Sequence, residues 1–200
     1  MQRTTRLAAL LLVPVLGAAT AFRELRPYVR DEPHSQINFL ASSRLIDAQG
    51  FWEKWTANIM FDPDALEKSS VSLDIDAKTI NTRVAMRDND LRSKNFFYTD
   101  SFPTITFASK IVNVPAGQPR DSLLSNTRMT ITGDLTIRGT TKSITVPSTL
   151  VFFDRKANRG RVKGKFTVMR KDYNVGYDPP MNPVQNEVEI NFDISFVGKR

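Results

Sequence analysis

Apolar and polar residues alternate with a period of two through most of this 200-residue chain. The segment RMTITGDLTIRG, residues 128–139, shows the pattern well: Met129, Ile131 and Leu135 fall on one face, whereas threonines and Asp134 fall on the other. Successive side chains of a β-strand point to opposite faces of the sheet, so this pattern predicts strands with one buried and one solvated face. Such half-buried strands are typical of antiparallel sheets.

The same pattern predicts eight strands after Ser35, and turn signals such as Asp62-Pro63 and Gly139 separate most neighbours. An all-β fold is therefore expected. Eight such strands in sequence favour an eight-stranded antiparallel up-and-down (lipocalin-like) β-barrel, which has no free edge and can enclose one small ligand. A two-sheet sandwich is the alternative. The predicted strands cover residues 36–42, 50–61, 71–77, 105–107, 128–139, 144–152, 162–168 and 188–196.

Several predicted strands are long enough to span roughly 35–40 Å when extended, which exceeds the usual strand length. Aromatic and branched residues fill their apolar faces. Periodicity alone leaves open whether these side chains pack into a solid core or form the wall of a pocket. If they form a wall, the elongated tube that results suits a long, thin, apolar ligand.

One short helix is predicted near residues 82–93, crossing one end of the barrel, with Phe96 and Phe97 covering that end. Asp88 and Arg92 are spaced i, i+4 in the favourable acid-first order. Two interpretations of Arg87 and Arg92 stay open. They form an ion-paired latch that fixes the crossing segment, or an unpaired arginine binds an acidic headgroup.

The N-terminus has the features of a signal peptide over residues 1–21, which leaves a barrel domain at residues 22–200. Arg3 and Arg6 precede a short apolar run that is interrupted by Pro14, and small residues end at Ala21. Export to a periplasm is expected, with an uncleaved anchor as the alternative. Cleavage would lower the net charge of +7 by two. The remaining charge is scattered, which argues against a nucleic-acid partner but leaves a transient contact with a membrane surface open.

Composition also excludes several kinds of chemistry. The chain has no cysteine and only one histidine, His34, so disulfides, thiolate sites and multi-histidine metal sites are excluded. No catalytic triad can be identified around His34, which is expected to bond a nearby turn or to contact a headgroup. We therefore predict a binding protein without catalytic residues, metal or cofactor.

Four motifs follow one another along the chain: DEPHSQINF, which begins at Asp31, RDNDLRSKNFF, GDLTIRGTTKSITV and MRKDYNVG. Together they resemble, in order, motifs of the YceI-like family of exported lipid-binding proteins. DEPHSQINF resembles that family's D-x-x-H-S-x-I-x-F start. RDNDLRSKNFF resembles R-D-x-H-L-R-S-x-D-F-F, and GDLTIRGTTKSITV resembles G-D-L-T-x-R-G-x-T-K-x-V-x-V. MRKDYNVG is similar to R-x-D-F-G. In this comparison Asp90 and Asn95 replace a histidine and an aspartate, and Ser43 stands near the position of another histidine.

This resemblance implies a lipocalin-like barrel that holds a polyisoprenoid, an isoprenoid quinone or a fatty chain, and it favours a pocket wall over a solid core. Two rivals stay open: an outer-membrane barrel with outward apolar faces, and an enzyme that uses the same pocket. The sequence leaves the oligomeric state open. The expected ligand-binding residues are Phe39, Phe51, Trp55, Ile75, Phe96, Phe97, Phe107, Ile131, Leu135, Phe166 and Phe192, with Arg87, Arg92 and His34 as candidates for the polar end of the ligand.

Overall fold

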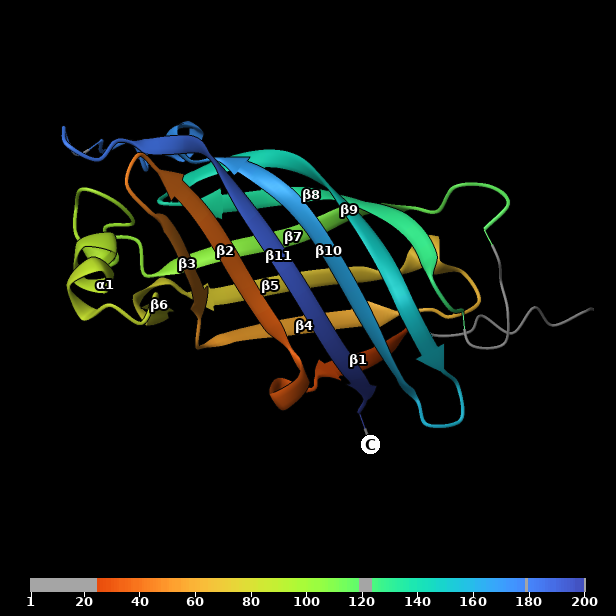
Figure 1. The fold of residues 1–200 in the computed structure, drawn as a ribbon. Helices are drawn as coiled ribbons and strands as arrows, with labels where there is room; N and C mark the ends of the chain where they lie inside the picture. The colour runs from red at the N-terminus through yellow and green to blue at the C-terminus, as the bar shows by residue number, and fades with distance from the viewer. Residues whose placement is uncertain (1–24, 119–123, 179, 200) are drawn as a thin grey trace, which may run out of the picture.

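The computed structural model describes residues 25–118, 124–178 and 180–199, so the predicted signal peptide lies outside the described residues. The described chain consists mainly of strands (Figure 1). The strands are β1 (Arg26–Arg30), β2 (Gln36–Ser43), β3 (Asp47–Trp52), β4 (Trp55–Phe61), β5 (Ser70–Asp76), β6 (Ile80–Asn81), β7 (Thr104–Asn113), β8 (Thr127–Ile137), β9 (Thr140–Asp154), β10 (Arg159–Met169) and β11 (Val184–Gly198). The helices are α1 (Ala85–Arg92) and the short 3₁₀ helices Glu32–His34, Leu66–Lys68, Ala77–Thr79 and Arg170–Tyr173.

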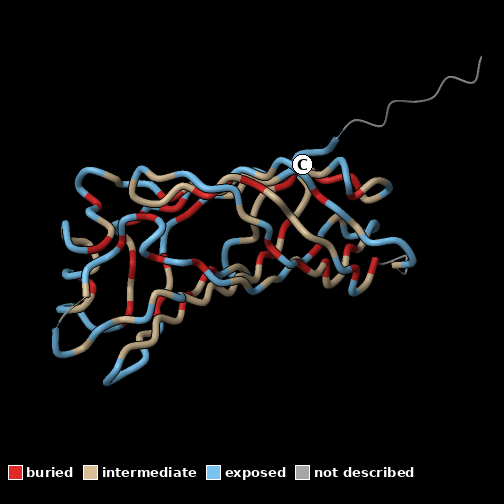
Figure 2. The backbone as a smooth tube through the Cα atoms, turned by 90° about the horizontal axis from the view of Figure 1, so that it is seen from above, coloured by how far each residue is buried: buried red, intermediate tan, exposed pale blue. Residues whose placement is uncertain are grey.

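These strands close an eight-stranded antiparallel barrel, which confirms the predicted fold. The ring runs β1, β4, β5, β7, β8, β9, β10 and β11, and β11 pairs back onto β1 through Arg30 and Phe196. Strands β2, β3 and β6 continue β1, β4 and β5 toward the end that carries α1, so three of the eight barrel strands are interrupted. We call this end of the barrel the helix end. Buried and exposed positions alternate along the strands (Figure 2).

One interruption changes which aromatic residues face inward. The predicted strand 50–61 stops at Glu53 and Lys54 and resumes as β4. The Glu53 amide donates to the carbonyl of Thr79 at 3.2 Å, so the chain stays in register with its neighbour across the break. Because of this break, the inner face is continued by Trp52 rather than by Phe51, which was expected among the ligand-binding residues of the interior.

Two other strand predictions also need correction. Strand β1 was not predicted, because Pro27 and the flanking arginines mask its alternation. Strand β9 contains a β-bulge opposite β10. Arg161 of β10 pairs with Phe152, whereas the next residue, Val162, pairs with Leu150, so β9 has one extra residue between them. A bulge inserts one extra residue and reverses the inward positions beyond it. Phe153, which is 1% exposed, therefore takes the buried position that the simple alternation gives to Phe152.

The short crossing helix is confirmed, but it is shorter than expected. α1 begins at Ala85 and ends at Arg92, and β6 occupies residues just before the predicted start. The helix lies across one end of the barrel (Figure 1). Its sequence has a poor apolar stripe, so the segment is held mainly by polar contacts and by the phenylalanines that follow it.

Candidate ligand-binding cavity

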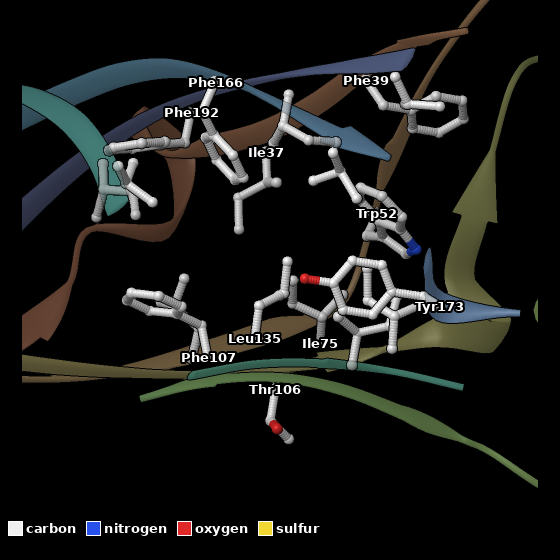
Figure 3. Close-up of a pocket in the computed structure, with 18 of the residues that line it drawn as sticks. Ile37, Phe39, Trp52, Ile75, Thr106, Phe107, Leu135, Phe166, Tyr173 and Phe192 are labelled. Carbon is white, nitrogen blue, oxygen red and sulfur yellow. The ribbon is translucent and has the colours of Figure 1, made fainter. Parts of the chain in front are cut away.

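The interior of the barrel contains a cavity of about 350 Å³ with almost entirely apolar walls (Figure 3). This volume is within the range of small-molecule sites. Every strand except the short β1 and β6 contributes wall residues, because most inward positions of the alternating pattern are apolar. In β8, for example, Met129, Ile131, Leu135 and Ile137 all line the cavity, as their spacing predicts.

Glycines at inward positions make room for aromatic rings. Phe39 lies opposite Gly50, and Phe192 lies opposite Gly164. A Cβ atom built on either glycine would approach the Cζ atom of the opposite ring to 2.4 Å. Each ring therefore lies across its neighbouring strand instead of projecting into the middle of the barrel. This cross-strand packing stabilises the wall and keeps the cavity open.

The end of the barrel away from α1 carries a cluster of aromatic side chains. Tyr28, Phe61, Phe153 and Phe196 are all buried, and their ring centroids lie 4.7–6.3 Å apart. The Tyr28 hydroxyl is used locally, since it donates to Asn158 Oδ1 at 2.7 Å. Phe61 and Phe196 also line the cavity. This end therefore offers an apolar floor without a free polar group from Tyr28.

The helix end carries most of the polar lining groups. Arg87, Asp90, Asn182 and Ser43 border the cavity there, and Asp90 and the neighbouring Ile46 are exposed. At the opposite end, Ser69 and the exposed Ser70 also line the cavity, beside the turn between β4 and β5. The contrast between an aromatic floor and a polar rim gives the tube a direction: an apolar chain fits toward the floor and a polar group fits toward the helix end.

Most of the predicted ligand-binding residues line the cavity. Phe51, Trp55, Arg92 and His34 do not. Trp55 is buried, and the guanidinium of Arg30 lies 3.9 Å from its ring centroid, so a cation–π contact occupies this ring instead. The lining positions among the predicted residues are Phe39, Ile75, Phe96, Phe97, Phe107, Ile131, Leu135, Phe166, Phe192 and Arg87.

The single histidine lies away from the cavity lining. His34 is in the 3₁₀ turn before β2, and its side chain is 72% exposed. Its Nδ1 atom lies 2.9 Å from the carboxylate of Asp31, three residues earlier. This contact fits the predicted role of bonding a nearby turn.

The predicted ion pairs of the crossing segment are wrong, because Asp88 and Arg92 bind other groups. Asp88 is buried and accepts hydrogen bonds from the amide and the hydroxyl of Thr82, at 2.8 Å and 2.5 Å. Arg92 donates to the backbone carbonyl of Ile80 at 3.1 Å and to Asn89 Oδ1 at 2.8 Å. Across the described ranges, no carboxylate lies within 4.0 Å of the guanidinium of either Arg87 or Arg92.

Backbone carbonyls and Thr82 thus replace carboxylates in holding the crossing segment. Arg87 donates through Nε to Thr82 Oγ1 at 2.8 Å and through Nη2 to the Thr82 carbonyl at 3.1 Å. These bonds join α1 to the end of β6. The contact of Arg87 with a ligand headgroup stays a prediction, since Arg87 lines the cavity as well.

The arginine Arg92 is expected to contribute to stability and not to ligand affinity. The Arg92→Ala variant loses hydrogen bonds from a charged group, so its free energy of unfolding should fall by about 1–3 kcal/mol. Its affinity for a long-chain alcohol should stay unchanged. Denaturant titration and equilibrium binding measure the two quantities. An Arg87→Gln variant that keeps its stability but loses affinity for a long-chain anion would instead indicate a headgroup contact at Arg87.

Two arginines that organise the helix end were not selected from the sequence. Arg138, in the turn between β8 and β9, donates to the carbonyl oxygens of Phe96 and Lys94, both at 2.8 Å, and to that of Asn174. It thereby ties the segment after α1 to the segment after β10. Its place in the GDLTIRG motif, next to the turn Gly139, was the signal that could have identified it.

Arg170 is the second of these arginines, and it is 5% exposed. It donates to the carbonyl oxygens of Val175 at 2.7 Å, Gln185 at 2.9 Å, Tyr177 at 3.1 Å and Val184 at 2.7 Å, and it pairs with Asp178. Hydrogen bonds from Lys171 and Arg170 hold the pKa of the Asp178 carboxyl below its usual range. The described residues between β10 and β11 are therefore folded around the buried guanidinium of Arg170.

Over the described ranges there is no group of three or more acidic, histidine or cysteine side chains that could hold a metal ion. Within the same part of the chain, no helix has the length and apolar character needed to cross a lipid bilayer.

The fold and the cavity together define a lipocalin-like barrel with one apolar interior site. The chain belongs to the YceI-like family, whose domain model matches residues 28–196. A curated relative, Protein YceI of Shigella flexneri, is 26% identical over 154 residues, which is 76% of this chain and 74% of that protein. A UPF0312 protein of Ectopseudomonas mendocina is 26% identical over 192 residues, or 94% and 95% of the two chains.

Solved structures show the same architecture. BcnA of Burkholderia cenocepacia aligns with a TM-score of 0.71 at 25% identity, covering 83% of this chain and 98% of that protein. A polyisoprenoid binding domain from Saccharophagus degradans, implicated in plant cell wall breakdown, aligns with a TM-score of 0.67 at 16% identity. That alignment covers 87% of this chain and 99% of the domain. At that identity, the second similarity concerns the fold alone.

Proposed function

We propose that this protein is an exported, periplasmic binding protein that carries a long-chain amphiphile in its barrel. The observation that carries this proposal is the apolar cavity inside the barrel, with an aromatic floor and a polar rim. An isoprenoid or acyl chain lies in the tube, and its polar end lies at the helix end. The polyisoprenoid binding domain of similar fold supports an isoprenoid chain as the ligand.

Burial of the chain supplies the binding free energy without any reaction. Each square ångström of apolar surface removed from water contributes roughly 25 cal/mol, and each buried methylene about 0.8 kcal/mol. A chain that fills the tube thus binds through its length. The few polar side chains at the helix end would determine which polar headgroup of the ligand is accepted.

The orientation of the strands disfavours the two rival functions. An outer-membrane barrel needs apolar residues facing lipid, whereas here the apolar faces of the strands line the interior. The outer face of β8 instead carries Thr132, Asp134 and Thr136. An enzyme using the single histidine as a general base would need that ring beside the chain, but His34 lies outside the lining.

A chain-length series tests the proposal directly. The mature protein, residues 22–200, is stripped of lipid and titrated with prenyl alcohols of increasing length while tryptophan fluorescence is followed. Trp52 lines the cavity and Trp55 does not, so the signal should come from Trp52 and be absent in a Trp52→Phe control. Affinity should rise about fourfold per added methylene until the tube is filled, and then level off. Affinity that is independent of length would contradict a buried chain.

A further inference from the structure

The hydroxyl group of Tyr173 stands out in the cavity wall. Tyr173 is 3% exposed and lines the cavity from the 3₁₀ helix after β10, and its hydroxyl points into the interior (Figure 3). In the described part of the chain, this hydroxyl has no hydrogen-bond partner. The other buried tyrosine, Tyr28, differs in this respect because Asn158 satisfies its hydroxyl.

The tyrosine is held in place by a well-defined segment. Asn174, in the left-handed region at φ 60°, ends the 3₁₀ helix, and its side-chain amide donates to Thr140 Oγ1 at 2.9 Å. The amide of Val175 donates to the carbonyl of Arg170 at 3.2 Å, which closes the turn around the tyrosine. A donor held in this way is preorganised, because little side-chain entropy is lost when an acceptor arrives.

The hydroxyl stays protonated at neutral pH. Burial, and secondarily the carboxylate of Asp172, raise the pKa of Tyr173 above its ordinary value. The phenol is therefore a hydrogen-bond donor under all physiological conditions. A donor that faces an apolar cavity finds no acceptor on the wall, so an acceptor on the ligand would bind favourably at this point.

We propose that Tyr173 donates a hydrogen bond to an uncharged oxygen of the ligand, a carbonyl of the quinone or ester type, held inside the tube near the helix end. This inference rests on the proposed function and specifies its ligand. The acceptor is uncharged because apolar side chains such as Ile75 and Leu135 face the same space (Figure 3). An anion buried there would lose its hydration without gaining a cation.

The cationic side chains of the lining support an uncharged acceptor. Arg170 uses its donors on backbone carbonyls and on Asp178, so its charge is already compensated. Arg87 donates to Thr82 and lies at the rim with the exposed Asp90. A chain that ended in a hydrocarbon would leave the Tyr173 hydroxyl unpaired, whereas a carbonyl would satisfy it.

A matched pair of ligands isolates this hydrogen bond. Decyl-1,4-benzoquinone and decylbenzene have similar shape and chain length, but only the quinone offers carbonyl acceptors. The Tyr173→Phe variant removes the hydroxyl and keeps the ring. Its affinity for the quinone should fall about three- to tenfold, as expected for one hydrogen bond, while its affinity for decylbenzene stays equal or rises. Calorimetric titration measures both affinities.

The controls separate failure of this inference from failure of the proposed function. Tyr177→Phe removes a hydroxyl from a 41% exposed ring outside the cavity lining, and it should change neither affinity. An equal loss for both ligands in Tyr173→Phe would show a packing role and overturn the inference. Unchanged affinity for both would also overturn it, since the donor would then be satisfied by water. Wild-type protein that binds neither ligand would contradict the proposed function itself.

Discussion

The Val162→Trp variant is expected to lose nearly all affinity for a long-chain ligand while it remains folded. Val162 faces the cavity from β10, where its neighbours across the sheet are Leu150 and Ile194. An indole at this position would occupy the space through which the chain must pass. Inserting a larger side chain into a well-packed core typically costs about 1–3 kcal/mol. Since the added ring here fills empty volume, the free energy of unfolding should fall by less than that. Equilibrium binding of a prenyl alcohol and thermal unfolding check the two effects.

The adjacent residue offers the matched control. Lys163 lies next to Val162 on the same strand, but its side chain is exposed on the outer face of the barrel. Lys163→Trp adds the same indole without entering the cavity, so affinity should match the wild type. If Val162→Trp bound the chain as tightly as Lys163→Trp, the ligand could not lie in the interior.

The Arg170→Met variant is expected to be the most destabilised single substitution considered. Methionine keeps much of the apolar length of the side chain but removes all its hydrogen bonds, so buried carbonyls such as those of Val175 and Val184 lose their donor. The free energy of unfolding should fall by about 3–4 kcal/mol, given the cost of unsatisfied buried acceptors. Denaturant titration measures this loss.

Arg161→Met provides the comparison on the outer surface. Arg161 pairs with Asp193 across β10 and β11, but its side chain is 44% exposed. Exposed ion pairs contribute little, so this variant should lose at most about 1 kcal/mol. Equal losses in the two variants would contradict the structural role assigned to the buried arginine.

The barrel could be predicted from the sequence because the alternation in strands such as β8 is uninterrupted and most of its inward residues, from Met129 to Ile137, are apolar. The errors fall where the alternation breaks. At Glu53 and Lys54 the chain resumes after a gap, and in β9 a bulge inserts one residue, so Trp52 and Phe153 replaced Phe51 and Phe152 on the inside. Period-two counting carries no information about bulges, which depend on the neighbouring strands.

The candidate site was predictable to a similar degree. Wall residues such as Phe107 and Leu135 follow from strand periodicity, so they could be named in advance. The partners of charged groups could not, since helical spacing suggested that Asp88 pairs with Arg92, whereas the fold brings Thr82 to Asp88 and the carbonyl of Ile80 to Arg92. Tyr173 lies in a loop without periodicity, and only the tertiary structure shows that its hydroxyl faces the cavity.

The central claim is that the interior of this barrel holds a long-chain amphiphile. Its most direct test is organic extraction of the mature protein, purified without detergent, followed by mass spectrometry of the extract. The extract of the wild type should contain an isoprenoid or acyl compound in near-equal molar amount to the protein, and that of Val162→Trp should not. Wild-type protein that is consistently empty, and that takes up no prenyl or acyl chain when one is offered, would contradict the account.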